Sequence, residues 1–194
     1  MPMSESKTSL RRQFLNVPNQ LTTSRLVLSI VVFVLIPCQC YLSALIVFVI
    51  AVSTDWVDGF WARRYGQVTK LGRVFDPFVD KIIVCGAFIL LAAEPGSGIA
   101  AWMAVIVVGR EMLVTTLRSL IEQSGGDFSA KMAGKLKMVF QCVAVVISLL
   151  VLMHGDREPP LWLTTALVVS VWVAVLLTIY SGVGYMLAAA RYFR

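Results

Sequence analysis

The sequence has few charged residues, which make up only 14% of its 194 positions. A soluble domain of this size carries about 25% charged residues. Hydrophobic residues reach 58% and the mean hydropathy is +0.82, so the composition excludes an ordinary soluble enzyme and indicates an integral membrane protein. No internal repeat, low-complexity tract or long polar linker interrupts the chain, which predicts a single membrane domain.

Histidine and cysteine are also scarce, with one and four copies. They form no CxxC or histidine-containing pattern of the kind that binds a metal ion. Cys38 and Cys40 flank one residue at a predicted turn, whereas Cys85 and Cys142 fall inside apolar runs. Free cysteine usually behaves as a small hydrophobic residue, so we interpret all four as structural. His154 is expected in a loop.

The first 20 residues form a basic, polar stretch that does not resemble a cleavable signal. They lead into an apolar run with no small-residue cleavage site after it. Leu10 and Phe14 alternate with Lys7, Arg11 and Arg12, as they would on an amphipathic helix at a membrane surface. We therefore expect residues 1–20 to be a cytoplasmic interfacial segment and residues 21–194 to be the membrane domain.

Six apolar runs follow one another along the rest of the chain. A helix that crosses a bilayer needs about 20 mostly apolar residues. Turn residues such as Pro37 and the pair Pro95-Gly96 separate the runs. The expected fold class is therefore all-α, a polytopic membrane protein with six transmembrane helices. The predicted spans are residues 21–36, 41–64, 74–93, 99–122, 130–153 and 161–190.

Basic residues fall almost entirely on one side of these predicted spans. With the N-terminus inside, all of the 17 lysines and arginines except Arg157 lie on the inner side. Such an excess marks the cytoplasmic side, so we expect an inner or cell membrane protein with both termini in the cytoplasm. The formal charge of +6 then indicates contact with anionic membrane lipids and phosphate-bearing substrates, and not with nucleic acid.

Four aspartates gather at the inner ends of the second and third predicted spans. Asp55 and Asp58 are three residues apart, and Asp76 and Asp80 are four apart, so each pair shares one helix face. Carboxylates that are partly desolvated together repel one another and resist ionisation. A divalent cation relieves this repulsion, and oxygen ligands beside a phosphate substrate suit Mg²⁺ or Mn²⁺. The pattern predicts a metal site in a polar cavity open to the cytoplasm.

Small residues and an arginine accompany the aspartates. Gly59 and Ala62 follow one turn after the first pair, and they leave room for a nucleobase or a diphosphate to approach the backbone. Arg63 is placed to hold a phosphate with its planar guanidinium. Gly72 is expected within a short basic loop from Arg63 to Arg73, where the chain must bend or admit a ligand.

The whole arrangement resembles the signature of the CDP-alcohol phosphotransferase family. The match runs Asp55-x-x-Asp58-Gly59-x-x-Ala62-Arg63, then eight residues, then Gly72-x-x-x-Asp76-x-x-x-Asp80. The resemblance implies a six-helix membrane fold, a homodimer and two divalent metal ions. It also implies that all four aspartates ligate metal and that Asp80 acts as the general base. The residues that it assigns to the CDP moiety are Asp58, Gly59, Ala62, Arg63 and Gly72.

Basic residues of the fourth and fifth predicted spans bear on the acceptor alcohol. Arg110 and Arg118 lie in the fourth span, and Lys135 and Lys137 lie near the start of the fifth. Several cations close to a metal site repel one another unless an anion lies among them, and a phosphorylated acceptor supplies that anion. The alternative is that these side chains extend to the lipid headgroups. Serine or choline as acceptor would bring no phosphate for the cluster to bind.

Within the family, three further runs resemble the bacterial phosphatidylglycerophosphate synthases. They are Asn16-Val17-Pro18-Asn19-x-Leu21-Thr22-x-x-Arg25, Arg110-Glu111-x-x-x-Thr115-x-Leu117-Arg118 and Gly134-Lys135-x-Lys137-x-x-x-Gln141. This resemblance implies transfer of a phosphatidyl group from CDP-diacylglycerol to glycerol 3-phosphate. It places Asn19 and Thr22 near the nucleotide diphosphate, and the acceptor's phosphate near Arg110, Arg118, Lys135 and Lys137. The last predicted span adds little beyond length.

Two alternatives stay open at this point. A sister transferase would use inositol phosphate or phosphatidylglycerol as acceptor, since acceptor selection can rest on few residues. A small cation transporter is a different class of protein, because aspartate clusters inside membranes also line ion paths. No charged residue continues the polar region outward through residues 82–93 or 161–190, which disfavours transport.

Overall fold

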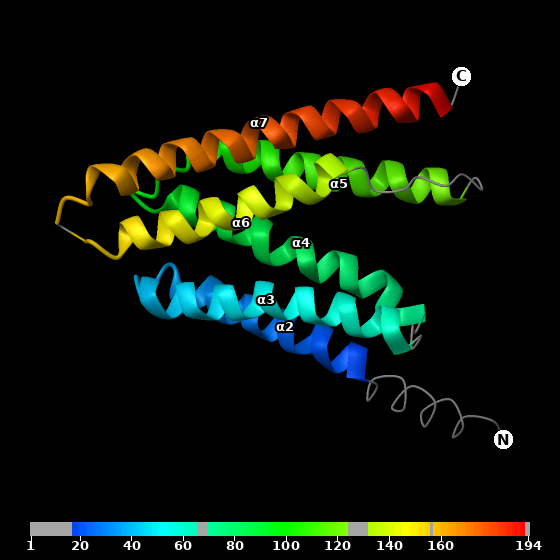
Figure 1. The fold of residues 1–194 in the computed structure, drawn as a ribbon, viewed down its shortest axis with the longest axis horizontal. Helices are drawn as coiled ribbons and strands as arrows, with labels where there is room; N and C mark the ends of the chain where they lie inside the picture. Colours follow the sequence, from blue (N-terminus) through cyan, green and yellow to red (C-terminus); the bar gives the residue numbers. More distant parts are fainter. Residues whose placement is uncertain (1–16, 66–69, 124–131, 156, 193–194) are drawn as a thin grey trace. The chain divides into compact units, whose positions relative to one another are not determined.

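The structure is a computed structural model that describes residues 17–65, 70–123, 132–155 and 157–192. Within these ranges the chain forms six α-helices and no strands (Figure 1). The prediction of an all-α fold with six helices is confirmed for this part of the chain. The helices are α2 (Val17–Leu35), α3 (Tyr41–Tyr65), α4 (Lys70–Ala93), α5 (Ala101–Gln123), α6 (Met132–Leu152) and α7 (Leu161–Tyr192).

Most helices end where proline or glycine was expected to interrupt them. After α2, Pro37 precedes a turn in which Gln39 has a φ of 58°. After α4, Gly98 has a φ of 72°, and a Cβ added there would lie 2.6 Å from Cδ2 of Leu167. Glycine is therefore required both by the backbone conformation and by the close approach of this loop to α7. His154 lies in the turn after α6, as expected.

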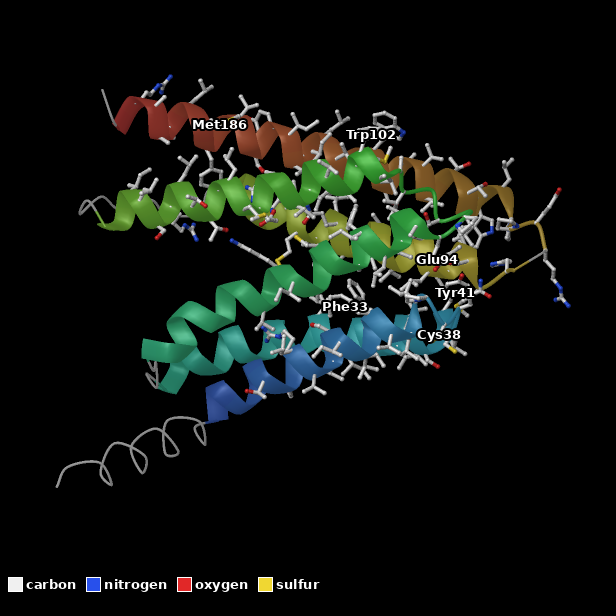
Figure 2. The ribbon with its side chains drawn as sticks, turned by 180° about the vertical axis from the view of Figure 1, so that it is seen from behind. Phe33, Cys38, Tyr41, Glu94, Trp102 and Met186 are labelled. Atoms are coloured by element: carbon white, nitrogen blue, oxygen red, sulfur yellow. The ribbon has the colours of Figure 1, made fainter. Side chains whose placement is uncertain are left out.

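None of the four cysteines forms a disulfide within the described part of the chain. Cys38 and Cys40 are exposed at the turn between α2 and α3, where Figure 2 labels Cys38 close to Tyr41. Cys85 and Cys142 are half-buried within α4 and α6. The partial burial of Cys85 and Cys142 agrees with a structural role, and for the exposed Cys38 and Cys40 that role stays a prediction.

The connection between α3 and α4 differs from the prediction of a loop from Arg63 to Arg73. Helix α3 continues through Tyr65 and α4 already begins at Lys70. Gly72 therefore lies in the first turn of a helix and not in a loop. The physical reason is that lysine, leucine and arginine favour helix, and one glycine costs only about 1 kcal/mol relative to alanine. Helix α2 also begins four residues before the predicted span, with Pro18 in its first turn, where proline is tolerated.

The chain divides into two compact units, the first ending at Ile83 and the second beginning at Val84. Helix α4 is continuous through this division. In the first unit α2 packs along α3, drawn in blue and cyan in Figure 1. Val32 of α2 and Ala44 and Phe48 of α3 are among its buried side chains.

In the second unit α7 packs against both α5 and α6 (Figure 1). The buried apolar side chains include Val107 of α5, Val145 of α6 and Val171 of α7. At the N-terminal end of α5, the ring of Trp102, labelled in Figure 2, lies 5.9 Å from the ring of Trp172 on α7 in a tilted arrangement. This three-helix group positions the basic residues that the sequence assigns to the acceptor.

Among the described residues, one helix is long and apolar enough to cross a membrane. It is the stretch Leu161–Arg191 of α7, with a mean hydropathy of 2.2. Four shorter apolar stretches lie in α2, α3, α4 and α6, at Thr23–Leu35, Tyr41–Thr54, Lys81–Ala93 and Leu136–Leu152.

Candidate active site

The four aspartates of the signature lie on two consecutive helices of the first unit. Asp55 and Asp58 belong to the C-terminal half of α3, and Asp76 and Asp80 belong to the N-terminal half of α4. Because the backbone is helical at both places, spacings of three and four residues put each pair on one helix face. The helical backbone expected at both pairs is confirmed, and the carboxylate site itself stays a prediction.

Several predicted site residues have side chains outside the described part of the structure. Their backbones lie in helices, so the helix to which each residue belongs is known. The contacts of their side chains stay predictions. They are Asn19 and Thr22 of α2, Asp55, Asp58, Gly59, Ala62 and Arg63 of α3, Gly72, Asp76 and Asp80 of α4, and Lys135 of α6.

The donor chemistry of the aspartates fits a divalent metal ion. Four carboxylates supply the oxygen ligands that Mg²⁺ and Mn²⁺ prefer, and Mg²⁺ commonly shares its coordination with substrate phosphates. No group of three or more histidine, cysteine, aspartate or glutamate side chains occurs among the described residues.

In the second unit, Glu111 of α5 joins two of the predicted basic site residues. Its Oε1 lies 3.0 Å from Nη1 of Arg110 and also forms an ion pair with Nζ of Lys137 on α6. The side chains of Lys137, Arg110 and Glu111 expose only 6%, 8% and 10% of their surface. Charges this deeply buried are tolerated when they are paired, so one carboxylate oxygen ties α5 to α6.

Helix α7 borders the other side of Arg110. The guanidinium carbon lies 5.4 Å from the ring centroid of the buried Tyr185, within the range of a cation–π interaction. Gly182, one turn earlier, faces the stem of Arg110, because a Cβ added there would lie 3.1 Å from Cγ of Arg110. Helix α7 therefore contributes to the surroundings of Arg110, which the family resemblance did not indicate.

A neutral polar pair lies one turn beyond Lys137 along α6. Nε2 of Gln141 donates to Oγ1 of Thr178 at 2.9 Å, and that hydroxyl donates to the carbonyl of Ala174 at 2.6 Å. Gln141 and Thr178 are both buried. Since each group has a partner, the pair links α6 to α7 without an unsatisfied amide.

A periodic signal in the sequence marks the inward face of α7. Thr178, Ser181, Gly182 and Tyr185 are spaced as neighbours on one side of a helix, and all four are buried in the structure. Polar and small residues in a membrane helix usually mark helix contacts. This spacing could have identified the face that meets Arg110 and Gln141, although no single residue in it is charged.

Arg118 completes the described part of the basic cluster. It is half-buried and lies two turns beyond Arg110 on α5. Together, Arg110, Arg118, Lys137 and Glu111 carry three positive charges and one negative charge. Glu111 of the protein itself thus supplies part of the negative charge that was expected among these cations.

Known proteins are similar to this chain over all of the predicted site residues. A family model described as CDP-alcohol phosphatidyltransferase matches residues 15–180, which include every predicted site residue. The CDP-diacylglycerol–glycerol-3-phosphate 3-phosphatidyltransferase of Bacillus subtilis (strain 168) is 34% identical over 186 residues, covering 88% of this chain and 93% of its own. The protein of the same description from Escherichia coli (strain K12) is 32% identical over 179 residues, covering 90% and 94%. The chain belongs to the CDP-alcohol phosphatidyltransferase family.

Proposed function

We propose that this protein transfers the phosphatidyl group of CDP-diacylglycerol to sn-glycerol 3-phosphate, giving phosphatidylglycerophosphate and CMP. The observation that carries the proposal is the match to two relatives described by that reaction, each over about nine-tenths of both chains. The buried basic cluster of the second unit supports a phosphorylated acceptor independently of those names.

On the donor side, Asp55, Asp58, Asp76 and Asp80 are the proposed metal ligands. Mg²⁺ or Mn²⁺, two ions by the family resemblance, would neutralise the diphosphate and stabilise the leaving CMP. The CDP group is bound by Asp58, Gly59, Ala62, Arg63 and Gly72, with Asn19 and Thr22 of α2 near the diphosphate.

Asp80 is also the proposed general base. Its carboxylate accepts the proton of the C1 hydroxyl of glycerol 3-phosphate as that oxygen attacks the lipid-linked phosphorus. A new phosphorus–oxygen bond forms to the acceptor while the bond to CMP breaks. The transfer is direct, with no covalent enzyme intermediate, and phosphatidylglycerophosphate and CMP then leave.

On the acceptor side, the phosphate is bound by Arg110, Arg118, Lys135 and Lys137. Three of these four side chains are described, and their positive charges suit a phosphate monoester, which carries about −1.5 to −2 charges near neutral pH. Oε1 of Glu111 holds one nitrogen of Arg110 and the amine of Lys137. Nε of Arg110 makes no hydrogen bond within the described residues, so this side chain keeps donor capacity for a phosphate oxygen.

We further propose that the six helices cross an inner or cell membrane as one domain, residues 21–194. Both termini would be cytoplasmic, with residues 1–20 on the membrane surface. The length and hydropathy of α7 support this, as do large apolar side chains that are exposed on several helices, such as Val34, Val105 and Leu176. A bilayer would cover them. A homodimer is proposed from the family resemblance.

An acceptor panel tests the reaction. Purified protein in detergent receives CDP-diacylglycerol, Mg²⁺ and one labelled acceptor at a time: glycerol 3-phosphate, inositol phosphate, phosphatidylglycerol or serine. We expect one molecule of glycerol 3-phosphate to be incorporated into lipid for each CMP released. Serine, which has no phosphate for the cluster, should react at least about 10⁴-fold more slowly, because it leaves buried polar groups unpaired.

Other results of this panel would assign a different function. Incorporation of inositol phosphate or of phosphatidylglycerol alone would identify the corresponding sister transferase. Absence of CMP release with every acceptor, together with uptake of a labelled cation into proteoliposomes, would support the transporter.

A further inference from the structure

We propose that Gly182 and Tyr185 of α7 are positioning residues that fix Arg110 for the acceptor's phosphate. The proposal rests on the proposed function in one respect, that the ligand of Arg110 is the phosphate of glycerol 3-phosphate. Both residues lie in the second unit, as does Arg110, and neither belongs to the family signature.

Arg110 is held at three points along its length. Its Nη1 donates a hydrogen bond to Oε1 of Glu111 at 3.0 Å, and the ring of Tyr185 lies 5.4 Å from the guanidinium carbon. Nearer the backbone, Cγ passes so close to Gly182 that a Cβ there would lie 3.1 Å away. Because the guanidinium is anchored, the stem has little freedom to move aside for an added methyl group.

This restraint matters for binding because arginine is flexible. A free arginine side chain carries about 2 kcal/mol of rotamer entropy, and ordering it upon binding weakens affinity. A guanidinium already oriented by a carboxylate and an aromatic ring loses less entropy when it binds an anion. Helix α7 would therefore raise the affinity of the acceptor site without touching the acceptor.

The glycine at position 182 serves this purpose in a way that its neighbours do not. Glycine inside a helix costs about 1 kcal/mol relative to alanine, and at position 182 an added side chain would meet Arg110. A Cβ added at Gly184, two residues further along the same helix, would meet no atom of the described residues within 4 Å. The same is true of Gly109, which precedes Arg110 on α5. The close approach to Arg110 is specific to Gly182 among these three.

The test compares Gly182→Ala with Gly184→Ala in the purified full-length protein. Both changes raise helix propensity equally, but only the first meets Arg110. We expect Gly182→Ala to raise KM for glycerol 3-phosphate about tenfold, equivalent to about 1.4 kcal/mol, with KM for CDP-diacylglycerol unchanged. Gly184→Ala should leave both constants at wild-type values.

A second pair of variants examines the ring. Tyr185→Leu removes the cation–π partner and should raise KM for glycerol 3-phosphate several-fold, whereas Tyr185→Phe keeps the ring and should stay closer to wild type. If Gly182→Ala yields no folded protein, the comparison of Tyr185→Leu with Tyr185→Phe tests the proposal by itself.

Three outcomes would overturn the proposal. They are equal KM values in Gly182→Ala and Gly184→Ala, equal rises for donor and acceptor, and equal effects of leucine and phenylalanine at position 185. Failure of the wild-type protein to use glycerol 3-phosphate at all would instead overturn the proposed function, so the two failures are distinguishable.

Discussion

Replacing Asp80 with asparagine is expected to lower kcat for phosphatidyl transfer by about 10²–10⁴-fold. Asparagine has nearly the same size, but it cannot accept the proton of the attacking hydroxyl, and it is a weaker ligand for a hard cation. The measurement is the rate of CMP release by purified protein with saturating CDP-diacylglycerol and glycerol 3-phosphate. Unchanged CMP release would remove Asp80 as the base.

The two roles proposed for Asp80 can be separated by comparison with Asp76→Asn. Asp76 is proposed only as a metal ligand, so raised Mg²⁺ or Mn²⁺ should restore part of the activity of Asp76→Asn by mass action. The same concentrations should leave Asp80→Asn inactive, because the lost proton acceptor is not replaced. Glu158→Gln, at an exposed position between α6 and α7, is a control for the loss of one carboxylate. Equal rescue of Asp76→Asn and Asp80→Asn would show that Asp80 acts only as a ligand.

Replacing Glu111 with leucine is expected to destabilise the fold by about 3–5 kcal/mol. Arg110 and Lys137 share Oε1 of Glu111, and both side chains are more than nine-tenths buried. Removing the carboxylate leaves two buried positive charges without this counter-ion. Reversible unfolding of the purified variant in mixed micelles measures the loss, with Glu158→Gln as the exposed control.

A second variant distinguishes lost charge pairing from lost packing. When both members of a buried pair are replaced by apolar residues, stability often returns. Glu111→Leu combined with Lys137→Met should therefore recover part of the stability, although it should remain a poor enzyme. A double variant no more stable than Glu111→Leu alone would contradict the importance of this ion pair.

The helices were largely predictable because their ends depend on local chemistry. Pro37, Pro95 and Gly155 lie between the apolar runs, where proline and glycine commonly mark the end of a helix. The connection between α3 and α4 was less predictable. There, charged residues such as Arg64 and Lys70 lower the hydropathy and so suggest an exposed loop. Arginine and lysine are nevertheless good helix formers. The helices consequently extend further than the apolar runs.

The aspartate motif and the basic cluster differ in how much of their chemistry is local. The signature from Asp55 to Asp80 falls within the first unit, where helical spacing alone indicates a carboxylate site. The pairing of Glu111 with Lys137, and of Arg110 with Tyr185, depends on which helices pack together in the second unit. Spacing within one helix carries no information about such partners, so these contacts required the structure.

The same division explains why the sequence indicates the donor more firmly than the acceptor. The residues assigned to the CDP group and the metal ions precede Ile83, whereas those assigned to the acceptor's phosphate follow Val84. The first set forms one long motif, and the second is a cluster of ordinary basic residues. Their specificity depends on burial and on partners such as Glu111 and Tyr185.

The central proposal is metal-dependent transfer by the aspartates of α3 and α4 to glycerol 3-phosphate. Its most direct test is CMP release by purified protein that has been stripped with EDTA and then supplied with CDP-diacylglycerol and glycerol 3-phosphate. We expect no release above background until Mg²⁺ or Mn²⁺ is added, and then one phosphatidylglycerophosphate formed for each CMP. Transfer that continues at the full rate in the stripped protein would contradict the proposal.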